Sequence, residues 1–490
     1  MKIGYAFLAG RCAFVPAPRI PAETASVKCR TLKDDRLLMP AASFPETNDL
    51  LKHAAFALAH EGVNMQILAQ ILPKITRNDM TSFVNSKPCS LLIRRAGWLW
   101  ELFTGQSLDF RTTATKYEPL FDPASYLTRD GGERSAKWKI TFNGLGTPKW
   151  CATVERTAAV HAGLSILDRA AEWFDSIGRR DAERVYARAR IHETMGSFEL
   201  EKDYLSEAKA DRFALLLRHA SENRRLSEGF LCELQNELID NPHAQACAYR
   251  TEQNWLADGP GGHSVTYVPP PPGLIGGLMS SWQEAAEMLP LQTDPIAAAA
   301  IVSFGFVYMH PFMDGNGRLS RFLIHQQLAA SGKLGKDRFL PVSIAMKKHE
   351  LEYLEALETF SKPARKAWQV IWTGGDPLCK CTFLGNESLY RYWDATRQVE
   401  FLYKMAAEAL DVHLQDEVGF LEKFDRLDRA VNDAFDIPQP LRFRMIQVYL
   451  EHGRLSLNFR KKFVCKIPGE AMDWLEANGA DIIRGDDIDL

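Results

Sequence analysis

One short segment of the chain concentrates residue types that could perform phosphate chemistry. Residues 310–321 read His-Pro-Phe-Met-Asp-Gly-Asn-Gly-Arg-Leu-Ser-Arg. A glycine-rich loop that leads into a helix presents unpaired backbone N–H groups, and together with the helix dipole these favour a bound anion. Glycine also lets phosphate oxygens approach the backbone closely. Gly315, Asn316 and Gly317 are therefore predicted to bind the phosphates of a nucleotide.

Charged and titratable residues flank this loop. Arg318 begins the following helix, where its guanidinium can donate hydrogen bonds to two phosphate oxygens. Arg321 lies one turn further along, on the same face of the helix. Asp314 offers the hard oxygen ligand that Mg²⁺ prefers when it is shared with phosphates. His310 can be neutral at pH 7 and accept a proton from an alcohol, which makes it the candidate general base. Each residue alone more often has a structural role, and it is their conjunction that favours catalysis.

The segment resembles the Fic motif, HxFx(D/E)GNGRxxR, at every specified position. The resemblance implies a protein adenylyltransferase (AMPylation), a nucleotidyltransferase with ATP as substrate and Mg²⁺ as cofactor. In that reaction His310 would deprotonate a Tyr, Thr or Ser hydroxyl of a target protein, and the oxygen would attack the α-phosphorus. Asp314 would hold the metal, and Arg318 would bind the β-phosphate.

A second resemblance concerns regulation. The stretch Ser197-Phe-Glu-Leu-Glu201-Lys202 lies on a predicted helix upstream of the motif and resembles the inhibitory sequence (S/T)xxxE(G/N) of one Fic class. The resemblance implies that Glu201 pairs with Arg321 and blocks the seat of the ATP γ-phosphate, with Ser197 as the first residue of the inhibitory motif. Lys202 departs from the usual Gly or Asn. A solvent-facing glutamate on a charged helix is the alternative.

A predicted hairpin precedes the catalytic segment. Two short strand-like runs flank a Gly/Pro turn within residues 248–273 and end in a polyproline stretch. This hairpin resembles the Fic flap, which holds a target segment by strand addition. The resemblance implies that Tyr267 and Val268 belong to the target-docking flap, whereas an ordinary surface hairpin is the alternative.

The rest of the chain indicates a mainly α protein, with a Fic-fold helical core and a small β-hairpin flap. Apolar residues recur at helical spacing through most of it, and Asp294-Pro295 marks a helix start. The expected domains are an N-terminal accessory helical domain (1–150), a helical region with the inhibitory helix (151–239), the Fic core with flap and catalytic motif (240–375), and a C-terminal helical domain for which a winged helix is one option (376–490).

Composition limits the partners. The chain has 490 residues, 46% of them hydrophobic and 25% charged, and a formal net charge of −3. That charge gives no global attraction to nucleic acid or to anionic membranes. The longest apolar run, 296–309, is too short to span a bilayer, and the nine cysteines show no zinc spacing. A cytoplasmic protein without a membrane partner is expected, and a homodimer is left open.

Other functions remain open from the sequence. Proteins of the same fold can remove AMP, with the inhibitory glutamate positioning water, or can transfer other phosphate-containing groups. A different class is a DNA-binding regulator that uses Arg460, Lys461 and Lys462 of a C-terminal helix. The target protein, which could be the chain itself, is not identified by the sequence.

Overall fold

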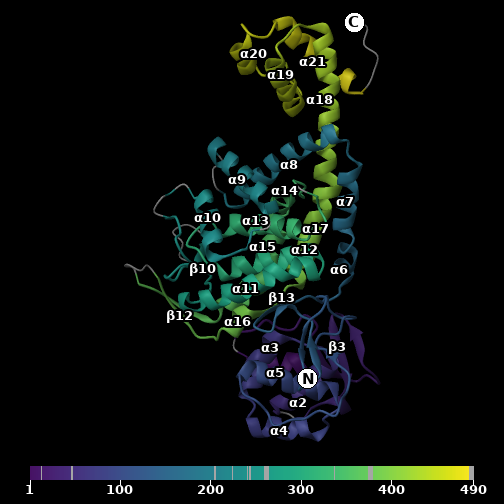
Figure 1. Ribbon diagram of the computed structural model, residues 1–490, viewed down its shortest axis with the longest axis vertical. Helices are drawn as coiled ribbons and strands as arrows, with labels where there is room; N and C mark the ends of the chain where they lie inside the picture. The colour runs from purple at the N-terminus through teal and green to yellow at the C-terminus, as the bar shows by residue number, and fades with distance from the viewer. Residues whose placement is uncertain are drawn as a thin grey trace.

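The computed structural model describes residues 1–12, 14–45, 48–202, 206–222, 224–239, 241, 244–258, 264–335, 337–373 and 379–484. Within these ranges the chain is mainly helical, with small sheets of two or three strands. Three units follow one another along the long axis of the molecule: an N-terminal unit, a central helical core and a C-terminal helical module (Figure 1). The mainly α fold class predicted from the sequence is confirmed.

The N-terminal unit combines helices with two three-stranded sheets, of order β1-β3-β2 and β4-β6-β5. The sequence predicted a helical domain here, and the strands correct that prediction. They are only two to five residues long, too short to show a period-two pattern of hydrophobicity. Its elements are α1 (Gly4–Ala9), β1 (Ala22–Ala25), β2 (Thr31–Lys33), β3 (Arg36–Pro40), α2 (Leu50–His60), α3 (Met65–Ile71), α4 (Arg77–Ser86), α5 (Leu91–Thr104), β4 (Glu118–Pro119), β5 (Glu133–Ser135) and β6 (Ile140–Phe142).

The central core is built around α12 (Pro295–Met309), which is apolar and buried along nearly its whole length. The side chain of Asp294 caps its first turn by accepting from the N–H groups of Ile296 and Ala297, and Pro295 takes the first helical position, as the sequence indicated. Around it lie α6 (Ala158–Gly163), α7 (Ile166–Ser176), α8 (Arg179–Leu200), α9 (Glu207–His219), α10 (Glu228–Leu238), α11 (Pro272–Gln292), α13 (Asn316–Ala330), α14 (Val342–Lys348), α15 (Glu350–Arg365) and α17 (Thr396–Glu408).

Short strands border the core and join it to the N-terminal unit. The strands are β7 (Leu145–Thr147), β8 (Trp150–Thr153), β9 (Leu256–Asp258), β10 (Ser264–Tyr267), β11 (Trp368–Trp372), β12 (Cys379–Phe383) and β13 (Tyr392–Asp394), and α16 (Ser388–Arg391) precedes the last of these. Strand β13 pairs in parallel with β8, in the register Tyr392↔Cys151. Tyr392 and Cys151 also belong to the apolar cluster of the N-terminal unit, so this sheet fastens the two units together.

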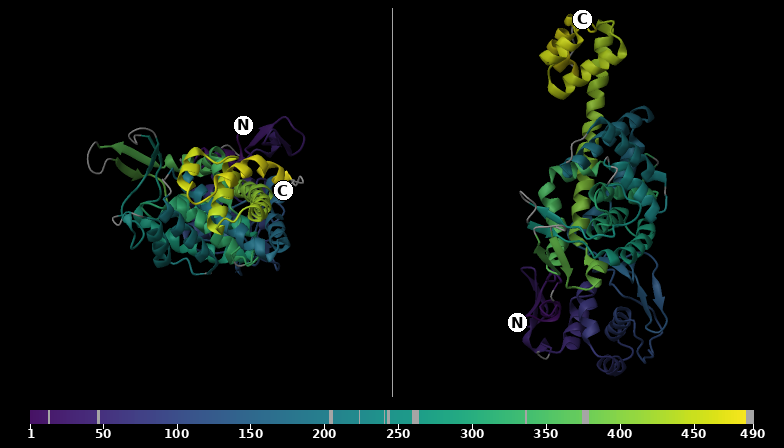
Figure 2. Two further views of the ribbon diagram at one scale, coloured as in Figure 1. Left: turned by 90° about the horizontal axis from the view of Figure 1, so that it is seen from above. Right: turned by 90° about the vertical axis from the view of Figure 1, so that its left-hand side faces the viewer.

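The C-terminal module is helical and is carried by one long rod. Helix α17 continues through a π-helical turn (Ala409–His413) into α18 (Leu414–Ala434), which runs from the core into the module (Figure 2). Helices α19 (Gln439–His452), α20 (Leu457–Phe463) and α21 (Gly469–Arg484) pack against its far end.

Two expectations for the C-terminal region are corrected. Residues 414–484 contain no strand, and a winged helix needs a β-hairpin wing, so that option is not realised in the described residues. The core cluster extends to Leu421, so the module begins well after the boundary expected at residue 376. The helical pattern runs unbroken through this junction, which hides it in the sequence.

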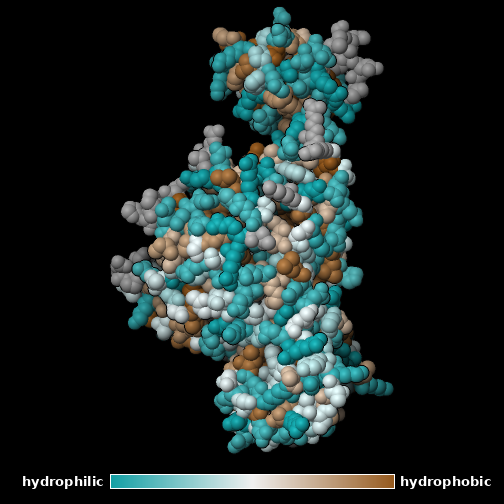
Figure 3. All heavy atoms as spheres, viewed as in Figure 1, coloured by the Kyte–Doolittle hydropathy of each residue, from teal (hydrophilic) through white to brown (hydrophobic). Residues whose placement is uncertain are grey.

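None of the described helices is both long and apolar enough to cross a lipid bilayer. On the face shown in Figure 3, hydrophilic residues dominate and the apolar ones form scattered patches.

Candidate active site

The end of α12 fixes the backbone of His310. This residue takes a left-handed conformation (φ 47°, ψ 59°), uncommon for a side chain other than glycine, and its N–H donates to the Phe306 carbonyl at 2.9 Å. Arg250 holds the strained turn in place: its Nε donates to the His310 carbonyl at 2.8 Å. The backbone N–H of Arg250 donates to the Pro311 carbonyl, also at 2.8 Å.

The imidazole of His310 is prepared to accept a proton. Its Nδ1 lies 3.2 Å from the Val307 carbonyl oxygen. Because a carbonyl only accepts, Nδ1 must carry the hydrogen, and Nε2 keeps a free lone pair. Burial lowers the pKa of His310 to about 4, although the Val307 hydrogen bond works in the opposite direction. The ring is therefore neutral near pH 7, as a general base requires.

The loop after His310 is shaped by Asn316. Its Oδ1 accepts from the Phe312 N–H at 3.1 Å, and its Nδ2 donates to the Phe312 carbonyl at 2.8 Å. Gly315 caps the loop with a φ of 84°, which favours glycine. The side-chain amide of Asn316 thus holds the loop together from both its oxygen and its nitrogen.

Arg318 and Asp314 lie at the start of α13. Arg318 is 7% exposed and donates from Nη1 to the Leu238 carbonyl at 3.1 Å. Its Nη2 lies 3.7 Å from Asp314 Oδ1, while the Asp314 side chain remains 59% exposed. This places one positive and one negative group beside the amides of the glycine loop.

Asp314 fits the Mg²⁺ ligand expected from the sequence. Its Oδ1 accepts from the Gly315 N–H at 2.6 Å, and the exposed carboxylate keeps further lone pairs. The described residues contain no group of three His, Cys, Asp or Glu side chains able to hold a metal. A magnesium ion bound here would thus take most of its ligands from phosphates and water, as Mg²⁺ commonly does.

Arg321 meets the residues predicted to oppose it. Its Nη2 lies 2.8 Å from Glu201 Oε1, so the ion pair expected from the sequence is present. Arg321 is 1% exposed and also donates from Nε to the Ser197 hydroxyl at 2.7 Å. Burial alone would raise the pKa of Glu201, but the charge and hydrogen bond of Arg321 outweigh it, and the pKa lies below its usual range. Glu201 is consequently an anion near neutral pH.

The carboxylate of Glu201 rests on the first turn of α13. A Cβ atom added to Gly317 would lie 2.0 Å from Glu201 Oε1, so a side chain at this position would force the carboxylate to move. The first turn of α13 is also the position where the glycine loop was expected to receive phosphate. A carboxylate and a phosphate oxygen would compete for that space and for the same donors.

The end of α8 explains the departure at Lys202. Glu201 caps the helix, and Lys202 follows in a left-handed conformation with a φ of 54°. Helices often end with a left-handed residue, usually Gly and sometimes Asn, which are the two residues of the inhibitory sequence. Lys202 thus adopts the same backbone turn with a less suitable side chain.

A second contact between α8 and α13 was not predicted. The fully buried carboxylate of Glu193 lies 2.7 Å from His325 Nε2, and it also accepts from the backbone N–H of Ser343 at 2.8 Å. Residues 193, 197 and 201 are spaced by four, as are 325, 321 and 317, so the two helices meet along matching faces. The sequence shows the four-residue spacing on each helix, but it does not show that the two helices pack together.

The flap residues lie differently from the expectation. Tyr267 and Val268 are 4% and 0% exposed, so their side chains belong to the core and cannot dock a target. The exposed side chains of β10 are Ser264 and Thr266. Strand addition uses backbone groups, and it remains a proposal for the β9–β10 hairpin, whose turn (259–263) lies outside the described residues.

Further residues that position the site escaped the sequence reading. Arg250 is 6% exposed and Asn254 is 8% exposed, and Asn254 Nδ2 donates to the Phe312 carbonyl at 3.2 Å. Gln235, from α10, donates to the Asp314 carbonyl at 3.3 Å. All three are polar residues outside the motif, and nothing in their local sequence distinguishes them from solvent-facing side chains.

Comparison with known proteins identifies a domain. Residues 225–328 match the Fic/DOC family model. The protein adenylyltransferase Fic of Culex quinquefasciatus is 35% identical over 101 residues, which cover 20% of this chain and 18% of that protein. The protein of the same name from Nematostella vectensis is 30% identical over 104 residues, or 21% of this chain and 22% of that protein. The chain therefore matches only about a fifth of the length of these relatives.

Two solved structures align with the chain at low identity and low TM-score. A Fic family protein from Desulfovibrio desulfuricans G20 has a TM-score of 0.41 and 16% identity, covering 62% of this chain and 90% of that one. Fic-1 (residues 134–508) from C. elegans has a TM-score of 0.36 and 15% identity, covering 77% of this chain and 95% of that one.

Proposed function

We propose that this chain, whose residues 225–328 form a Fic/DOC family domain, is a protein adenylyltransferase restrained by its own Glu201. It would transfer AMP from ATP to a Tyr, Thr or Ser hydroxyl of a target protein. The observation that carries the proposal is the neutral imidazole of His310, with Nε2 free, beside a glycine loop that opens α13. The named relatives, matched over this same domain, support it.

The reaction follows from this geometry. The ATP phosphates would lie against the N–H groups of residues 315–317, with Arg318 on the β-phosphate. The target hydroxyl gives its proton to His310 Nε2 as its oxygen bonds to the α-phosphorus. The bond from that phosphorus to the bridging oxygen breaks, and pyrophosphate leaves. The protein contributes mainly orientation and fixed positive charge.

A magnesium ion is proposed as the cofactor, held by Asp314 together with the phosphates. It would neutralise negative charge on the departing pyrophosphate. Asp314 also keeps the loop closed through the Gly315 N–H.

Restraint by Glu201 is the regulatory part of the proposal. Its carboxylate contacts Gly317 and Arg321, two groups that the terminal phosphate of ATP would need. Arg321 is buried and Glu201 is partly exposed, and the charge-assisted hydrogen bond between them resists displacement by a competing anion. ATP would therefore seat poorly for transfer until Glu201 moves away.

Removal of AMP is a second candidate, because Glu201 lies close enough to His310 for its charge to raise the pKa of that imidazole against the larger effect of burial. A carboxylate beside a histidine could orient a water molecule toward a phosphorus atom. The DNA-binding alternative gains less support: Arg460 already pairs with Asp473 at 2.6 Å and with Glu476 at 2.7 Å.

The test compares full-length wild type with Glu201→Gly, using α-labelled ATP and a cell lysate. We expect Glu201→Gly to label itself or a lysate protein more strongly, and mass spectrometry to find an added AMP rather than a phosphate. Glu199→Gly is the matched control, because Glu199 lies on the same helix with its side chain exposed. Equal labelling by the two variants would contradict the proposed restraint by Glu201. Loss of AMP from a premodified target, without any transfer from ATP, would favour removal of AMP as the function.

A further inference from the structure

A cavity of about 750 Å³ lies between the ends of α7 and α9, the N-terminal half of α8 and the loop that joins α13 to α14. A recess of about 30 Å³ adjoins this α8–α9 cavity, and Arg190, Arg218, Asp337 and Arg338 line both. None of the residues predicted to bind ATP or Mg²⁺ lines either one. Along α8, Arg190 precedes Glu201 by about 16 Å, at about 1.5 Å per residue. The cavity is therefore separate from the candidate active site.

Two guanidinium groups of the α8–α9 cavity have no counter-ion. Among the described residues, no ion pair or hydrogen bond engages the side chain of Arg190 or of Arg218. The two charges nevertheless act on each other. Burial lowers the pKa of the half-buried Arg190, and the charge of Arg218 lowers it further, against a smaller opposite effect of Asp337. An oxyanion placed between two such groups would relieve their repulsion and accept several charge-assisted hydrogen bonds.

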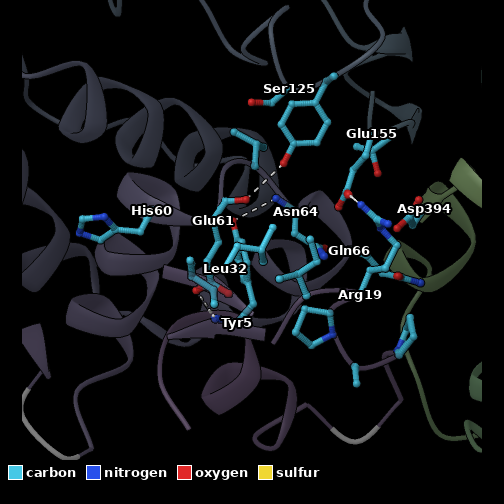
Figure 4. Close-up of a pocket in the computed structure, with 18 of the residues that line it drawn as sticks. Tyr5, Arg19, Leu32, His60, Glu61, Asn64, Gln66, Ser125, Glu155 and Asp394 are labelled. Carbon is cyan, nitrogen blue, oxygen red and sulfur yellow. Dashed lines mark hydrogen bonds and ion pairs between the residues drawn. The ribbon is translucent and has the colours of Figure 1, made fainter. Parts of the chain in front are cut away.

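Two other arginines that line cavities already have a carboxylate partner. Arg338, in the α8–α9 cavity itself, lies 2.6 Å from Asp175. A second cavity, of about 260 Å³, lies where the N-terminal unit meets β8 and β13, and there Arg19 is paired with Glu155 (Figure 4). Neither of these two guanidinium groups calls for a bound anion.

The α8–α9 cavity also contains groups that accept hydrogen bonds. The exposed carboxylates of Glu183 and Asp337 line it, and no ion pair joins either to a described residue. His325 lines the recess: its Nε2 lies 2.7 Å from the Glu193 carboxylate, whereas its Nδ1 is buried without a partner. Because a carboxylate only accepts, Nε2 carries the hydrogen, and Nδ1 of the neutral ring is an acceptor. The recess is large enough for a hydroxyl group or a water molecule.

This combination of groups selects among oxyanions. Carboxylates repel an anion that offers only lone pairs, but they accept from one that also brings a hydroxyl hydrogen. Phosphate keeps a hydroxyl group near neutral pH, and a sugar phosphate has hydroxyl groups on its sugar. Sulfate has none.

We propose that the α8–α9 cavity binds a phosphate group between the guanidinium groups of Arg190 and Arg218, with a hydroxyl group of the ligand toward Asp337 and the recess beside His325. The phosphate belongs to the free ion or to a small sugar phosphate, and both share this chemistry. A volume of about 750 Å³ is typical of small-molecule sites. The bound group would join α8, which supplies Arg190, to α9, which supplies Arg218.

The test titrates four compounds into the full-length chain by calorimetry, in the absence of ATP: inorganic phosphate, ribose 5-phosphate, sulfate and ribose. We expect at least one of the two phosphates to bind, and the tighter of them identifies the source of the phosphate group. Sulfate should bind about tenfold more weakly or worse, because it brings no hydrogen to the acceptors, and ribose should not bind. Absence of binding by both phosphates at millimolar concentration, or sulfate that binds as tightly as the better phosphate, would overturn the proposal.

Variants locate the site. Arg190→Gln and Arg218→Gln each remove one guanidinium but keep a polar side chain, and each should weaken phosphate binding about tenfold or more while circular dichroism stays unchanged. Arg225→Gln is the matched control, because this arginine lies outside the cavity with its side chain 77% exposed, and it should bind as wild type does. The glycine loop of the candidate active site is a competing anion site. Unchanged binding in either cavity variant, or an equal loss in Arg225→Gln, would therefore show that phosphate binds elsewhere.

Discussion

At the scale of single residues, two neighbours of His310 fix the tautomer of its ring and the conformation of its backbone. The Val307 carbonyl selects the tautomer with Nε2 free, and Arg250 holds the backbone turn that ends α12. Both act without touching the substrate. The histidine is thus prepared as a base before ATP arrives.

This preparation predicts a pH profile for transfer. Burial lowers the pKa of His310 to about 4, so the neutral, proton-accepting form should persist well below the usual histidine range. In Glu201→Gly, initial rates of labelling from pH 4.5 to 8 should show no loss of activity centred near 6.5. His310→Ala in the same background should lose about 10²–10⁴-fold in rate yet still bind ATP. A midpoint near 6.5, or full labelling by a folded His310→Ala protein, would contradict this role.

Lys202 supports a second prediction, on stability. Its φ of 54° is unfavourable for a side chain with a Cβ atom. Lys202→Gly should therefore raise the free energy of unfolding by roughly 0.5–1 kcal/mol, measured by denaturant titration. Lys202→Ala removes the charge but keeps the Cβ atom, so it should give no such gain. If alanine stabilises as much as glycine, the benefit comes from charge and not from the backbone.

The sequence could identify some residues of the candidate site and not others. His310, Asp314 and Arg318 could be singled out as candidates because their proposed roles depend on a local loop, whose spacing is visible along the chain. Glu193 and Arg250 are not found, because their partners lie more than 50 residues away. Tyr267 was placed in the correct hairpin, but strand alternation alone did not show which face is buried.

At the scale of elements, α8 is held from two sides. Its inner face meets α13 through Glu193, Ser197 and Glu201. On another face, Arg188 and His192 both contact Glu417 of α18, each at 2.5 Å. Arg184 adds a bidentate pair with Asp425, with both distances 2.8 Å. The helix that carries Glu201 is therefore positioned by α18 as well as by the site.

Glu417 provides the prediction for this contact. It is 3% exposed, and removing its charge leaves Arg188 without its carboxylate partner and changes the contact with His192. Glu417→Gln should cost about 3–5 kcal/mol of folding stability locally. We expect faster hydrogen exchange over residues 181–201 and stronger self-labelling with α-labelled ATP.

The matched control is Asp411→Asn, on the same rod. Asp411 pairs with Arg169 at 2.5 Å, but both side chains are 48% exposed, and such surface pairs contribute little. Its exchange and labelling should equal those of wild type. Slow exchange of α8 in Glu417→Gln would indicate that α13 alone holds the helix.

At the scale of the whole molecule, the sequence predicted the helical character of the core better than the boundaries between the units. The helical core follows from periodicity and from the Asp294-Pro295 start of α12. The sheets of the N-terminal unit are built from strands of two to five residues, too short for a recognisable alternation, and the sheet that joins this unit to the core pairs β13 with β8, segments far apart in the sequence. The end of the core near Leu421 falls inside one continuous helix, where composition does not change.

That continuous helix has a mechanical consequence. From Thr396 to Ala434 the chain forms an unbroken rod, roughly 60 Å long at about 1.5 Å per residue. Its first helix, α17, packs on α12, the middle of the rod contacts α8 through Glu417 and Asp425, and the far end carries the C-terminal module. Because the helix is continuous, a twist applied at one end is transmitted along its length. A twist of the module would therefore be transmitted to α8, which contacts the rod through Glu417 and Asp425.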